Sequence, residues 1–348
     1  MGAEDITAVR DSQRFDEQRL AGYLHEHVTD FAGPLTVQQF TGGQSNPTYL
    51  LSTPARRYVL RRKPSGELLP SAHAIEREYR VMHALGAHTQ VPVPRALALC
   101  LDETVIGTRF FIMEYVTGRI FWDGAFPEVA ARERAAYFDA MNATLAQLHA
   151  VDYVAAGLAD YGKPADYVRR QIARWSGQYR QDAAAGRVPI FERLMEWLGA
   201  HVPARQEVAL VHGDFRCDNL LFDTSEPRVL AILDWELSTL GDPLADFAYH
   251  LMMYYSSSDS RGLAGRSLSE LGIPTPEQYV AAYCGRTGRS AIEDLDFYLA
   301  FNFFRSAAIC HGIRGRIVRG TAVSARAKEH AARVEQSAEL GWAHAQRG

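Results

Sequence analysis

The sequence predicts an α+β fold, with a β-rich N-terminal part followed by a larger, mainly helical part. Up to about residue 115, short runs rich in β-branched and aromatic residues predict strands. Beyond residue 116, apolar residues recur at helical spacing over most of the chain. With 348 residues, the chain is long enough for one large or two medium domains. We therefore divide it into residues 1–115 and residues 116–348.

The composition is that of an ordinary globular protein with a slightly acidic charge balance. Lys and Arg number 37 against 41 Asp and Glu, and no long basic run is present, so nothing indicates a nucleic-acid partner. No apolar run approaches a membrane span, and no signal-peptide pattern opens the sequence. The four cysteines form no C-x-x-C pair, which is typical of reduced thiols. We therefore expect a cytoplasmic protein without a membrane partner.

The N-terminal part begins with a helix and a hairpin. Apolar residues at helical spacing predict the helix over residues 15–28. Leu35–Phe40 and Pro47–Ser52 predict two strands around the small polar segment TGGQSN at residues 41–46. Such a segment lets backbone N–H groups approach phosphate oxygens closely, although a plain hairpin turn would look the same.

Tyr58–Lys63, YVLRRK, predicts the next strand and supplies basic side chains. Strand alternation places Val59, Arg61 and Lys63 on one face. Arg62 lies on the other face, and we expect it to point to solvent. The whole chain contains only three lysines, so a nucleotide site that needs a basic residue has few lysines to choose from.

A helix over residues 72–88 and a central strand at Arg109–Val116, RFFIMEYV, complete the predicted N-terminal part. Glu76 and Glu78 lie near the start of the helix. For Glu76 the alternative is a surface charge, as most helical glutamates are. Beyond residue 116 the sequence predicts a buried helix at 295–309, an Ala-rich surface helix within 321–346, and further helices at 130–150, 167–179, 191–201 and 277–283.

Residues 208–246 concentrate side chains that suit phosphoryl transfer. Val208–Val211 and Val229–Leu233 predict short strands, the first leading to Asp214 and the second to Asp234. Asn219 follows Asp214 by five residues. Phosphoryl transfer needs a carboxylate that orients and deprotonates the attacking hydroxyl, and oxygen ligands that hold Mg²⁺. Asp214 is the candidate base, and Asn219 and Asp234 are candidate Mg²⁺ ligands; each residue alone would also suit a turn.

These residues carry a resemblance to a known family. HGDxxxxN at residues 212–219, DWE at 234–236 and GDPxxD at 241–246 resemble motifs of the aminoglycoside phosphotransferase-like, or choline-kinase-like, family of the protein-kinase fold. The likeness is closest to the kinase-like domain associated with acyl-CoA dehydrogenases, and it covers nearly the whole chain. It implies a two-lobed fold. Residues 1–115 would form the nucleotide-binding lobe, and residues 116–348 the catalytic and substrate-binding lobe.

The resemblance also implies roles for residues around the nucleotide. The segment at residues 42–49 resembles the G-G-x-S-N-x-T-Y pattern of the acyl-CoA-associated subfamily. It implies phosphate contacts by Gly43, Ser45 and Asn46. The family's phosphate-binding lysine is matched by Arg61, with Lys63 as the alternative.

Further roles follow from the same resemblance. Glu78 matches the glutamate that pairs with the phosphate-binding residue, and the backbone of Glu114 and Val116 would meet adenine. Asp246 would hold the backbone of the catalytic loop. We expect His212 to brace that loop rather than to transfer protons.

Together these features predict a kinase that uses ATP and Mg²⁺ to phosphorylate a hydroxyl group of a small molecule. Residues 163–187 and 305–319 are rich in arginine, which favours an anionic acceptor such as a hydroxyacyl-CoA or a hydroxy acid, unless these arginines only form solvated faces. One alternative is an aminoglycoside phosphotransferase acting on a cationic antibiotic. The other is an inactive nucleotide-binding module, which arginine at the lysine position favours. The acceptor's identity, a preference for ATP over GTP, and the oligomeric state do not follow from the sequence.

Overall fold

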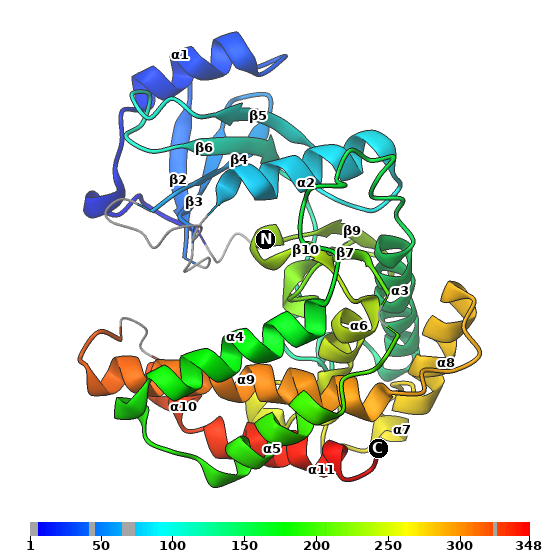
Figure 1. Cartoon of the computed structure of the whole chain (residues 1–348). Coiled ribbons are helices and arrows are strands. Elements are labelled where there is room, and N and C mark those ends of the chain that lie inside the picture. The colour runs from blue at the N-terminus through cyan, green and yellow to red at the C-terminus, as the bar shows by residue number, and fades with distance from the viewer. Residues whose placement is uncertain (1–5, 42–45, 65–73, 206, 323–325) are drawn as a thin grey trace. The chain divides into compact units, whose positions relative to one another are not determined.

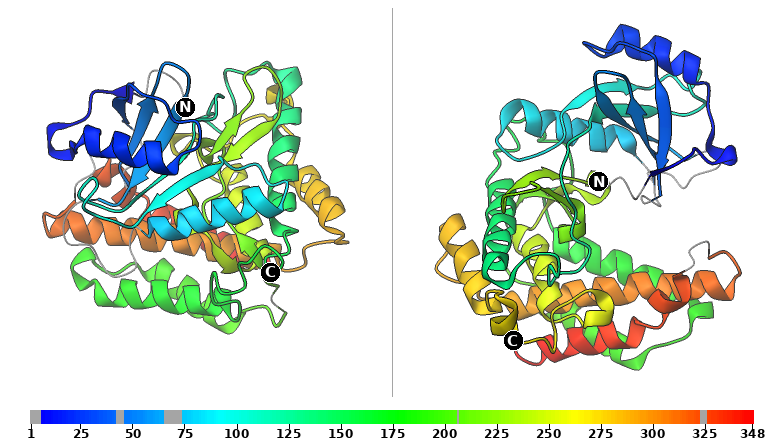
Figure 2. Two further views of the ribbon diagram at one scale, coloured as in Figure 1. Left: turned by 90° about the horizontal axis from the view of Figure 1, so that it is seen from above. Right: turned by 180° about the vertical axis from the view of Figure 1, so that it is seen from behind.

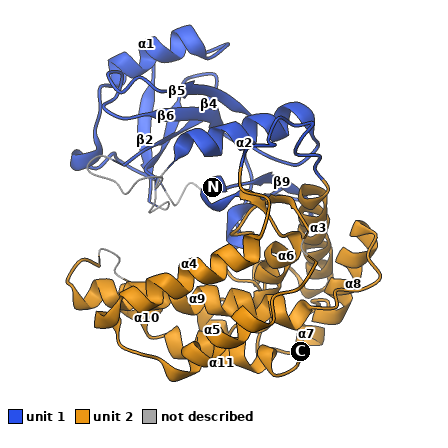
Figure 3. Cartoon of the chain, in the orientation of Figure 1, with its two compact units in different colours: residues 1–122, 151–161, 216–238 blue, residues 123–150, 162–215, 239–348 orange. Residues whose placement is uncertain are grey.

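The structure of the chain, a computed structural model, describes residues 6–41, 46–64, 74–205, 207–322 and 326–348. The chain forms two compact units, shown in different colours in Figure 3. Unit 1 comprises residues 1–122, 151–161 and 216–238, and unit 2 comprises residues 123–150, 162–215 and 239–348. Unit 1 contains an antiparallel sheet and unit 2 is mainly helical (Figure 1), so the predicted α+β class is confirmed.

A six-stranded sheet with the strand order β1-β2-β3-β4-β6-β5 forms the framework of unit 1. All neighbouring strands in it are antiparallel. Its strands are β1 (Ile6–Thr7), β2 (Thr36–Phe40), β3 (Thr48–Ser52), β4 (Arg57–Arg62), β5 (Ala96–Cys100) and β6 (Phe110–Glu114). A separate hairpin of unit 1 is formed by β8 (Leu220–Phe222) and β9 (Val229–Ile232).

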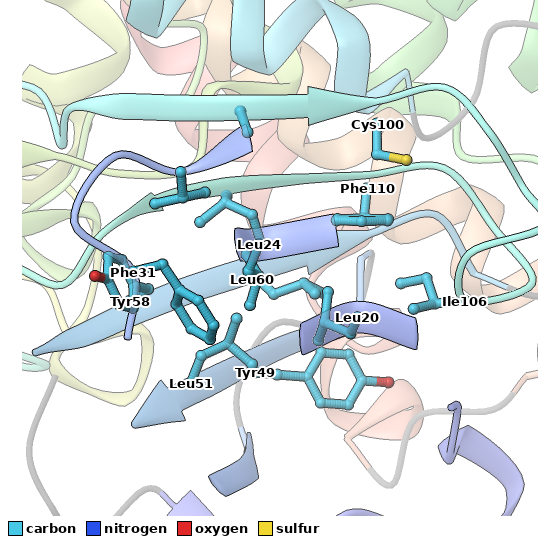
Figure 4. Close-up of a cluster of buried hydrophobic side chains, with 13 residues drawn as sticks. Leu20, Leu24, Phe31, Tyr49, Leu51, Tyr58, Leu60, Cys100, Ile106 and Phe110 are labelled. Atoms are coloured by element: carbon cyan, nitrogen blue, oxygen red, sulfur yellow. The ribbon is translucent and has the colours of Figure 1, made fainter. Parts of the chain in front are cut away.

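One face of the sheet packs against α1 (Glu17–His27), whose N-terminus is capped by the Asp16 carboxylate. Leu20 and Leu24 of this helix join a buried cluster with Tyr49, Leu60 and other alternate residues of the strands (Figure 4). Because side chains alternate along a strand, the remaining positions of β4 and β6 point to the opposite face. Arg61 is one of them.

The helix α2 (Ile75–His88) contacts β5 and β6 of the sheet. Its buried stripe includes Glu78 beside apolar residues such as Val81 and Leu85. The short turn at Trp235–Leu237, which follows β9, also contacts α2. The helix therefore connects the sheet with the segment that carries Asp234.

Unit 2 is organised around the long, buried helix α9 (Leu295–Val318), which packs against α4, α5, α6, α10 and α11. Figure 2 shows α9 in orange beside the red C-terminal helices. The other helices are α3 (Ala131–His149), α4 (Tyr167–Gln181), α5 (Pro189–Ala200), α6 (Pro243–Leu251), α7 (Leu268–Leu271), α8 (Pro276–Thr287), α10 (Ala327–Ala331) and α11 (Val334–Ala345). Strands β7 (Ala209–Val211) and β10 (Thr239–Gly241) pair as an antiparallel ribbon beside them.

Several predicted elements are confirmed, and two expectations need correction. The strand β5 was not predicted, because Pro92 and Pro94 before it indicated only the start of an extended connection. The predicted surface helix within 321–346 is two helices, α10 and α11, and α11 is buried along one side. Its Gly341 lies so close to α9 that an added Cβ would come within 3.2 Å of the Ala300 carbonyl oxygen. No helix in the described part of the chain is long and apolar enough to cross a membrane.

Candidate active site

The predicted site residues fall into two groups, one in each unit. Unit 1 contains the predicted residues for nucleotide and metal, including Arg61, Glu78 and Asp234. Unit 2 contains the candidate base Asp214 and its predicted support, Asp246.

In unit 1, one buried guanidinium is surrounded by carboxylates. Arg61 Nε lies 3.0 Å from Glu78 Oε2, and its Nη2 lies 2.7 Å from Asp234 Oδ1. The same Nη2 is 3.7 Å from Glu236 Oε2. We call Arg61, Glu78, Asp234 and Glu236 the Arg61 cluster. The predicted ion pair between Arg61 and Glu78 is therefore present in the structure.

The two ends of the Arg61 cluster differ in their exposure to solvent. Glu78 is 3% exposed, whereas Asp234 is 34% exposed. Burial raises the pKa of Glu78 to about 7; Arg61 opposes this shift, and the neighbouring carboxylates of Asp234 and Glu236 reinforce it. The same carboxylates hold the pKa of Arg61 above its ordinary value, although burial acts against them. Asp234 is thus the more accessible end of a cluster with more negative than positive side chains.

The side chain of Asn46 joins this cluster. It is completely buried and donates from Nδ2 to Glu78 Oε1 at 2.8 Å. Gly43 and Ser45, the other residues of the predicted phosphate-binding turn, lie outside the described residues. Asn46 and Arg61 therefore contact the same carboxylate, that of Glu78.

The candidate metal ligands Asn219 and Asp234 lie at the same end of the β8–β9 hairpin. Asn219 directly precedes β8, and Asp234 follows β9 by two residues. The Leu233 N–H donates to the Asn219 carbonyl at 2.8 Å, which joins their backbones. Asp234 has a φ of 63°, a left-handed conformation that is uncommon for residues other than glycine and that often marks functional sites.

The donor set fits Mg²⁺ better than a structural metal. Among the described residues, no three His, Cys, Asp or Glu side chains gather as a metal-binding group. An amide oxygen and a carboxylate, with the remaining positions left to phosphate and water, are typical of Mg²⁺ sites. Asn219 and Asp234 are the residues that would hold the ion.

An apolar pocket of unit 1 lies at the end of β6. Glu114, Tyr115 and Val116 line it. The other lining residues are apolar: Val59, Pro94, Met113, Leu221 and Leu233. Apolar walls suit contact with the faces of an aromatic ring. The predicted adenine contacts, Glu114 and Val116, therefore lie in a pocket of suitable chemistry.

One prediction about strand β4 is wrong. Arg62 is 3% exposed and does not point to solvent. Its guanidinium lies over the rings of Phe15 and Tyr49, with 5.3 and 5.4 Å to the ring centroids, and donates to the Gln13 carbonyl. The N-terminal segment covers this face of the sheet, which strand alternation alone does not reveal.

In unit 2, Asp214 stands on a loop that α6 holds in place. We call residues 212–215 the Asp214 loop. Asp246 accepts the backbone N–H groups of His212 and Gly213, each at 2.8 Å. Gly213 has a φ of 83°, so this turn needs glycine. His212 is completely buried and accepts the Asp214 N–H at Nδ1, as expected for a residue that braces the loop.

Two histidines that the sequence did not single out for the site complete this support. His149 Nε2 donates to Asp246 at 3.2 Å and its Nδ1 contacts the Tyr283 hydroxyl at 2.7 Å. Although burial by itself raises the pKa of Asp246, the hydrogen bond from His149 and the charges and backbone donors around it hold that pKa below its usual range. Since His149 is 97 residues from Asp246 in sequence, no local pattern could have paired them.

The second histidine, His250, contacts the carbonyl of Phe215 at 3.2 Å through Nδ1. Burial lowers the pKa of His250 to about 4, so its ring is neutral near neutral pH. A carbonyl only accepts, so Nδ1 carries the proton and Nε2 accepts the Tyr279 hydroxyl at 2.7 Å. The Asp214 loop is thus also held at its far end.

The side chain of Asp214 has a partner on α6 that the sequence analysis missed. The Tyr249 hydroxyl donates to Asp214 Oδ1. Tyr249 lies three residues after Asp246 on the same helix, so helical spacing was a signal that could have identified it. Arg305 of α9 lies beside this pair, with its guanidinium 5.5 Å from the centroid of the Tyr249 ring.

Comparisons with known proteins agree with the family resemblance seen in the sequence. A family model described as the phosphotransferase enzyme family matches residues 36–292 of this chain. The acyl-CoA dehydrogenase family member 10 of Mus musculus is 48% identical over 329 residues, which cover 94% of this chain and 30% of that protein. The chain thus spans less than a third of the length of this curated relative.

Solved structures extend the comparison. A structure of a candidate aminoglycoside phosphotransferase from Ralstonia eutropha is 49% identical, with a TM-score of 0.88, and the match covers 96% of this chain and 99% of that one. A spectinomycin phosphotransferase in complex with ADP and spectinomycin is 12% identical, with a TM-score of 0.58, and the match covers 94% of this chain and 98% of that one. The latter likeness shows the fold alone. The predicted protein-kinase-like fold is therefore confirmed.

Proposed function

The chain belongs to the phosphotransferase enzyme family, and from this premise we propose that it is a small-molecule kinase that transfers the γ-phosphoryl group of ATP to a hydroxyl of an anionic acceptor. The observation that carries the proposal is the fixation of Asp214, whose loop is held by Asp246 through two backbone amides. Phosphoryl transfer depends mainly on positioning and electrostatics, and a fixed carboxylate supplies both.

Asp214 would act on the acceptor. Its carboxylate orients the acceptor hydroxyl and takes the hydroxyl proton while the new oxygen–phosphorus bond forms. The bond between the γ-phosphorus and the β,γ-bridging oxygen breaks, and ADP leaves. His212 stays out of the proton transfer, because its Nδ1 accepts the Asp214 N–H within the turn.

Unit 1 would bind the nucleotide. The adenine ring would occupy the apolar pocket, next to the backbone of Glu114 and Val116. Arg61 would contact the phosphates, with Asn46, Gly43 and Ser45 as further contacts; arginine keeps the charge that the family's lysine supplies, in a bidentate geometry. Mg²⁺ held by Asn219 and Asp234 would offset the negative charge of the phosphates.

The charges of unit 2 favour an anionic acceptor of the hydroxyacyl-CoA or hydroxy-acid type. Arg305, from the predicted arginine-rich stretch 305–319, donates to the Gly213 carbonyl of the Asp214 loop at 3.5 Å. Two other arginines of that stretch are neutralised by acids from elsewhere, since Arg314 pairs with Glu335 and Arg319 with Asp182. Of these three arginines, Arg305 contacts the Asp214 loop, and its positive charge favours an anionic acceptor there. The name of the mouse relative points to acyl-CoA compounds as well.

A cationic aminoglycoside acceptor is the second candidate, favoured by the name of the Ralstonia eutropha protein. An acceptor with several amino groups would need carboxylates around it. Phosphorylation assays decide between the two classes directly.

The test is ADP release with 3-hydroxybutyryl-CoA, 3-hydroxybutyrate or kanamycin as the offered acceptor, with and without Mg²⁺. We expect Mg²⁺-dependent turnover with the anionic compounds, and weaker acceptor binding in added salt because salt screens charges. Efficient turnover of kanamycin alone would contradict the anionic acceptor, and nucleotide binding without turnover on a wider hydroxyl panel would favour the inactive module.

The candidate base is tested by Asp214→Asn. We expect turnover to fall by a factor on the order of 10² or more, with ATP affinity and thermal stability nearly unchanged. Asp139→Asn, at an exposed acid of α3 that pairs with Arg286, is the matched control and should keep full activity. Normal turnover in Asp214→Asn would remove Asp214 from the mechanism.

A further inference from the structure

Three residues of α6 face the Asp214 loop at helical spacing. Asp246 binds the amides of residues 212 and 213, and His250 binds the carbonyl of Phe215. Tyr249 lies between them in sequence and contacts a side chain, because its hydroxyl donates to Asp214 Oδ1. The helix thus fixes the loop's backbone at both ends and the candidate base itself in the middle.

The contact with Tyr249 restricts the carboxylate of Asp214. The χ2 torsion of an aspartate is broad, so a backbone fixed by α6 does not by itself fix the direction of the carboxylate oxygens. A hydrogen bond from a hydroxyl to a charged carboxylate is among the stronger ones in proteins. With Oδ1 held by a phenol on a helix, rotation of the carboxylate about χ2 is restricted.

Tyr249 is in turn held by α9. Tyr298 donates to Asp242 at the start of α6, and Asn302 donates to the Ala245 carbonyl at 2.8 Å. Arg305, one turn further along α9, is 8% exposed and places its guanidinium over the Tyr249 ring. Its Nη1 donates to Asn302 Oδ1 at 3.1 Å, which fixes the guanidinium. These three residues form one stripe of α9 that stabilises α6 and the tyrosine.

We propose that Tyr249 is a positioning residue for phosphoryl transfer: its hydroxyl, held beside Arg305, aligns the Asp214 carboxylate so that it receives the acceptor's proton. This inference rests on the proposed function. The acceptor proton moves to a carboxylate oxygen of Asp214 as the acceptor oxygen bonds to the γ-phosphorus, and Tyr249 keeps its own proton throughout. No further reactant is needed beyond ATP and the hydroxyl compound.

The experiment is Tyr249→Phe, which removes only the hydroxyl. We expect kcat with 3-hydroxybutyryl-CoA to fall by about ten- to hundredfold, the size of a lost hydrogen bond to a charged group, while KM for ATP changes by less than about twofold. Tyr254→Phe is the matched control, because this tyrosine is buried nearby and its hydroxyl has no hydrogen-bond partner among the described residues. Its kinetics should equal those of the wild type.

A second measurement keeps the contact testable without turnover. Protein labelled with carbon-13 at tyrosine Cζ reports each phenol by NMR, and Tyr249→Phe assigns the Tyr249 signal. We expect Asp214→Asn to move this signal and to leave the Tyr254 signal in place.

The possible outcomes are distinct. A wild-type kcat in Tyr249→Phe, or a loss of kcat together with ATP affinity and thermal stability, would overturn the positioning role. If the wild type phosphorylates no hydroxyl compound, the proposed function is wrong, and the positioning role of Tyr249 in phosphoryl transfer is wrong as well. The NMR signal then decides whether the Tyr249–Asp214 contact exists, and an unmoved signal overturns that as well.

Discussion

In unit 1 the candidate nucleotide site is held by ion pairs between side chains, whereas in unit 2 the Asp214 loop is held mainly by hydrogen bonds to its backbone. Arg61 shares one positive charge among Glu78, Asp234 and Glu236. Asp246, by contrast, accepts hydrogen bonds from two backbone N–H groups of the Asp214 loop. The candidate nucleotide site therefore depends on the balance of side-chain charges, whereas the Asp214 loop depends on an acceptor for its backbone N–H groups.

The pKa values of the two buried carboxyls show this difference. Burial raises the pKa of Glu78 to about 7, since its one arginine also serves two other carboxylates. Burial acts in the same direction on Asp246, but the His149 hydrogen bond and further donors more than offset it and lower its pKa. A buried carboxylate is thus stabilised by the number of donors devoted to it. The Arg61 cluster has more negative than positive side chains, which suits a bound cation. The Asp214 loop has a fixed geometry.

The largest expected effect is in unit 2, from Asp246→Ala. The variant leaves the amides of His212 and Gly213 and the ring of His149 without their acceptor. We expect the free energy of unfolding to fall by about 3–5 kcal/mol, because each buried donor left without an acceptor costs about 1–3 kcal/mol, and we expect turnover to be lost. Urea denaturation measures the first quantity. Asp139→Ala is the exposed control, and equal stability of the two variants would contradict the backbone support by Asp246.

Next in size is Asp234→Ala in unit 1, which tests the metal site. We expect ATP affinity in the presence of Mg²⁺ to weaken by about ten- to hundredfold and the effect of Mg²⁺ on binding to disappear. Calorimetric titration with and without Mg²⁺ measures both. Asp223→Ala, at the other end of the β8–β9 hairpin, is the matched control. Unchanged Mg²⁺-ATP affinity in Asp234→Ala would move the metal site elsewhere.

Variants of the two neighbouring arginines of β4 should distinguish an effect on ATP binding from an effect on the stability of the fold. We expect Arg61→Ala to raise KM for ATP and to lower turnover, because it removes the proposed phosphate contact. Arg62→Ala should leave KM unchanged and lower the free energy of unfolding by about 1–3 kcal/mol, since it removes cation–π contacts and a buried hydrogen bond. Steady-state kinetics and urea denaturation of both variants give the answer. A KM effect from Arg62 would place the nucleotide on the other face of the sheet.

The smallest expected effect is a pH dependence at Glu78. Its pKa in the folded chain, about 7, lies above the ordinary value of 4.5. The stability that Glu78 contributes is therefore fully present below the ordinary value and is lost as the pH rises through about 7. Glu78→Gln does not titrate. We expect its melting temperature to rise relative to the wild type between about pH 5 and about pH 8.

Glu76→Gln is the control on the same helix. The hydrogen bond from Arg109 lowers the pKa of Glu76 against the opposing effect of burial, so its contribution is lost only as the pH falls. A parallel pH dependence in both variants would contradict the interpretation of Glu78.

Local pattern was enough for much of the fold and for the core of the candidate site. Apolar periodicity predicted α1, α2 and the strand that carries Arg61, because each of these elements displays its buried side in its own sequence. The spacing of Asp214, Asn219 and Asp234 was also readable, since Asp214 and Asp234 follow strand ends and Asn219 directly precedes a strand. Their roles, and the boundary near residue 115 between a nucleotide-binding and a substrate-binding part, stay predictions.

The sequence by itself determined which side chains share a face and which motifs follow which strand, because both depend on short-range geometry. Only the tertiary structure decided what covers each face. It brought Gln13 and Phe15 over Arg62, and His149 to Asp246 across 97 residues. It also placed Arg305 of α9 beside Tyr249 of α6. Such contacts depend on how helices and sheet pack, and the residues that make them carry no local mark of their partners.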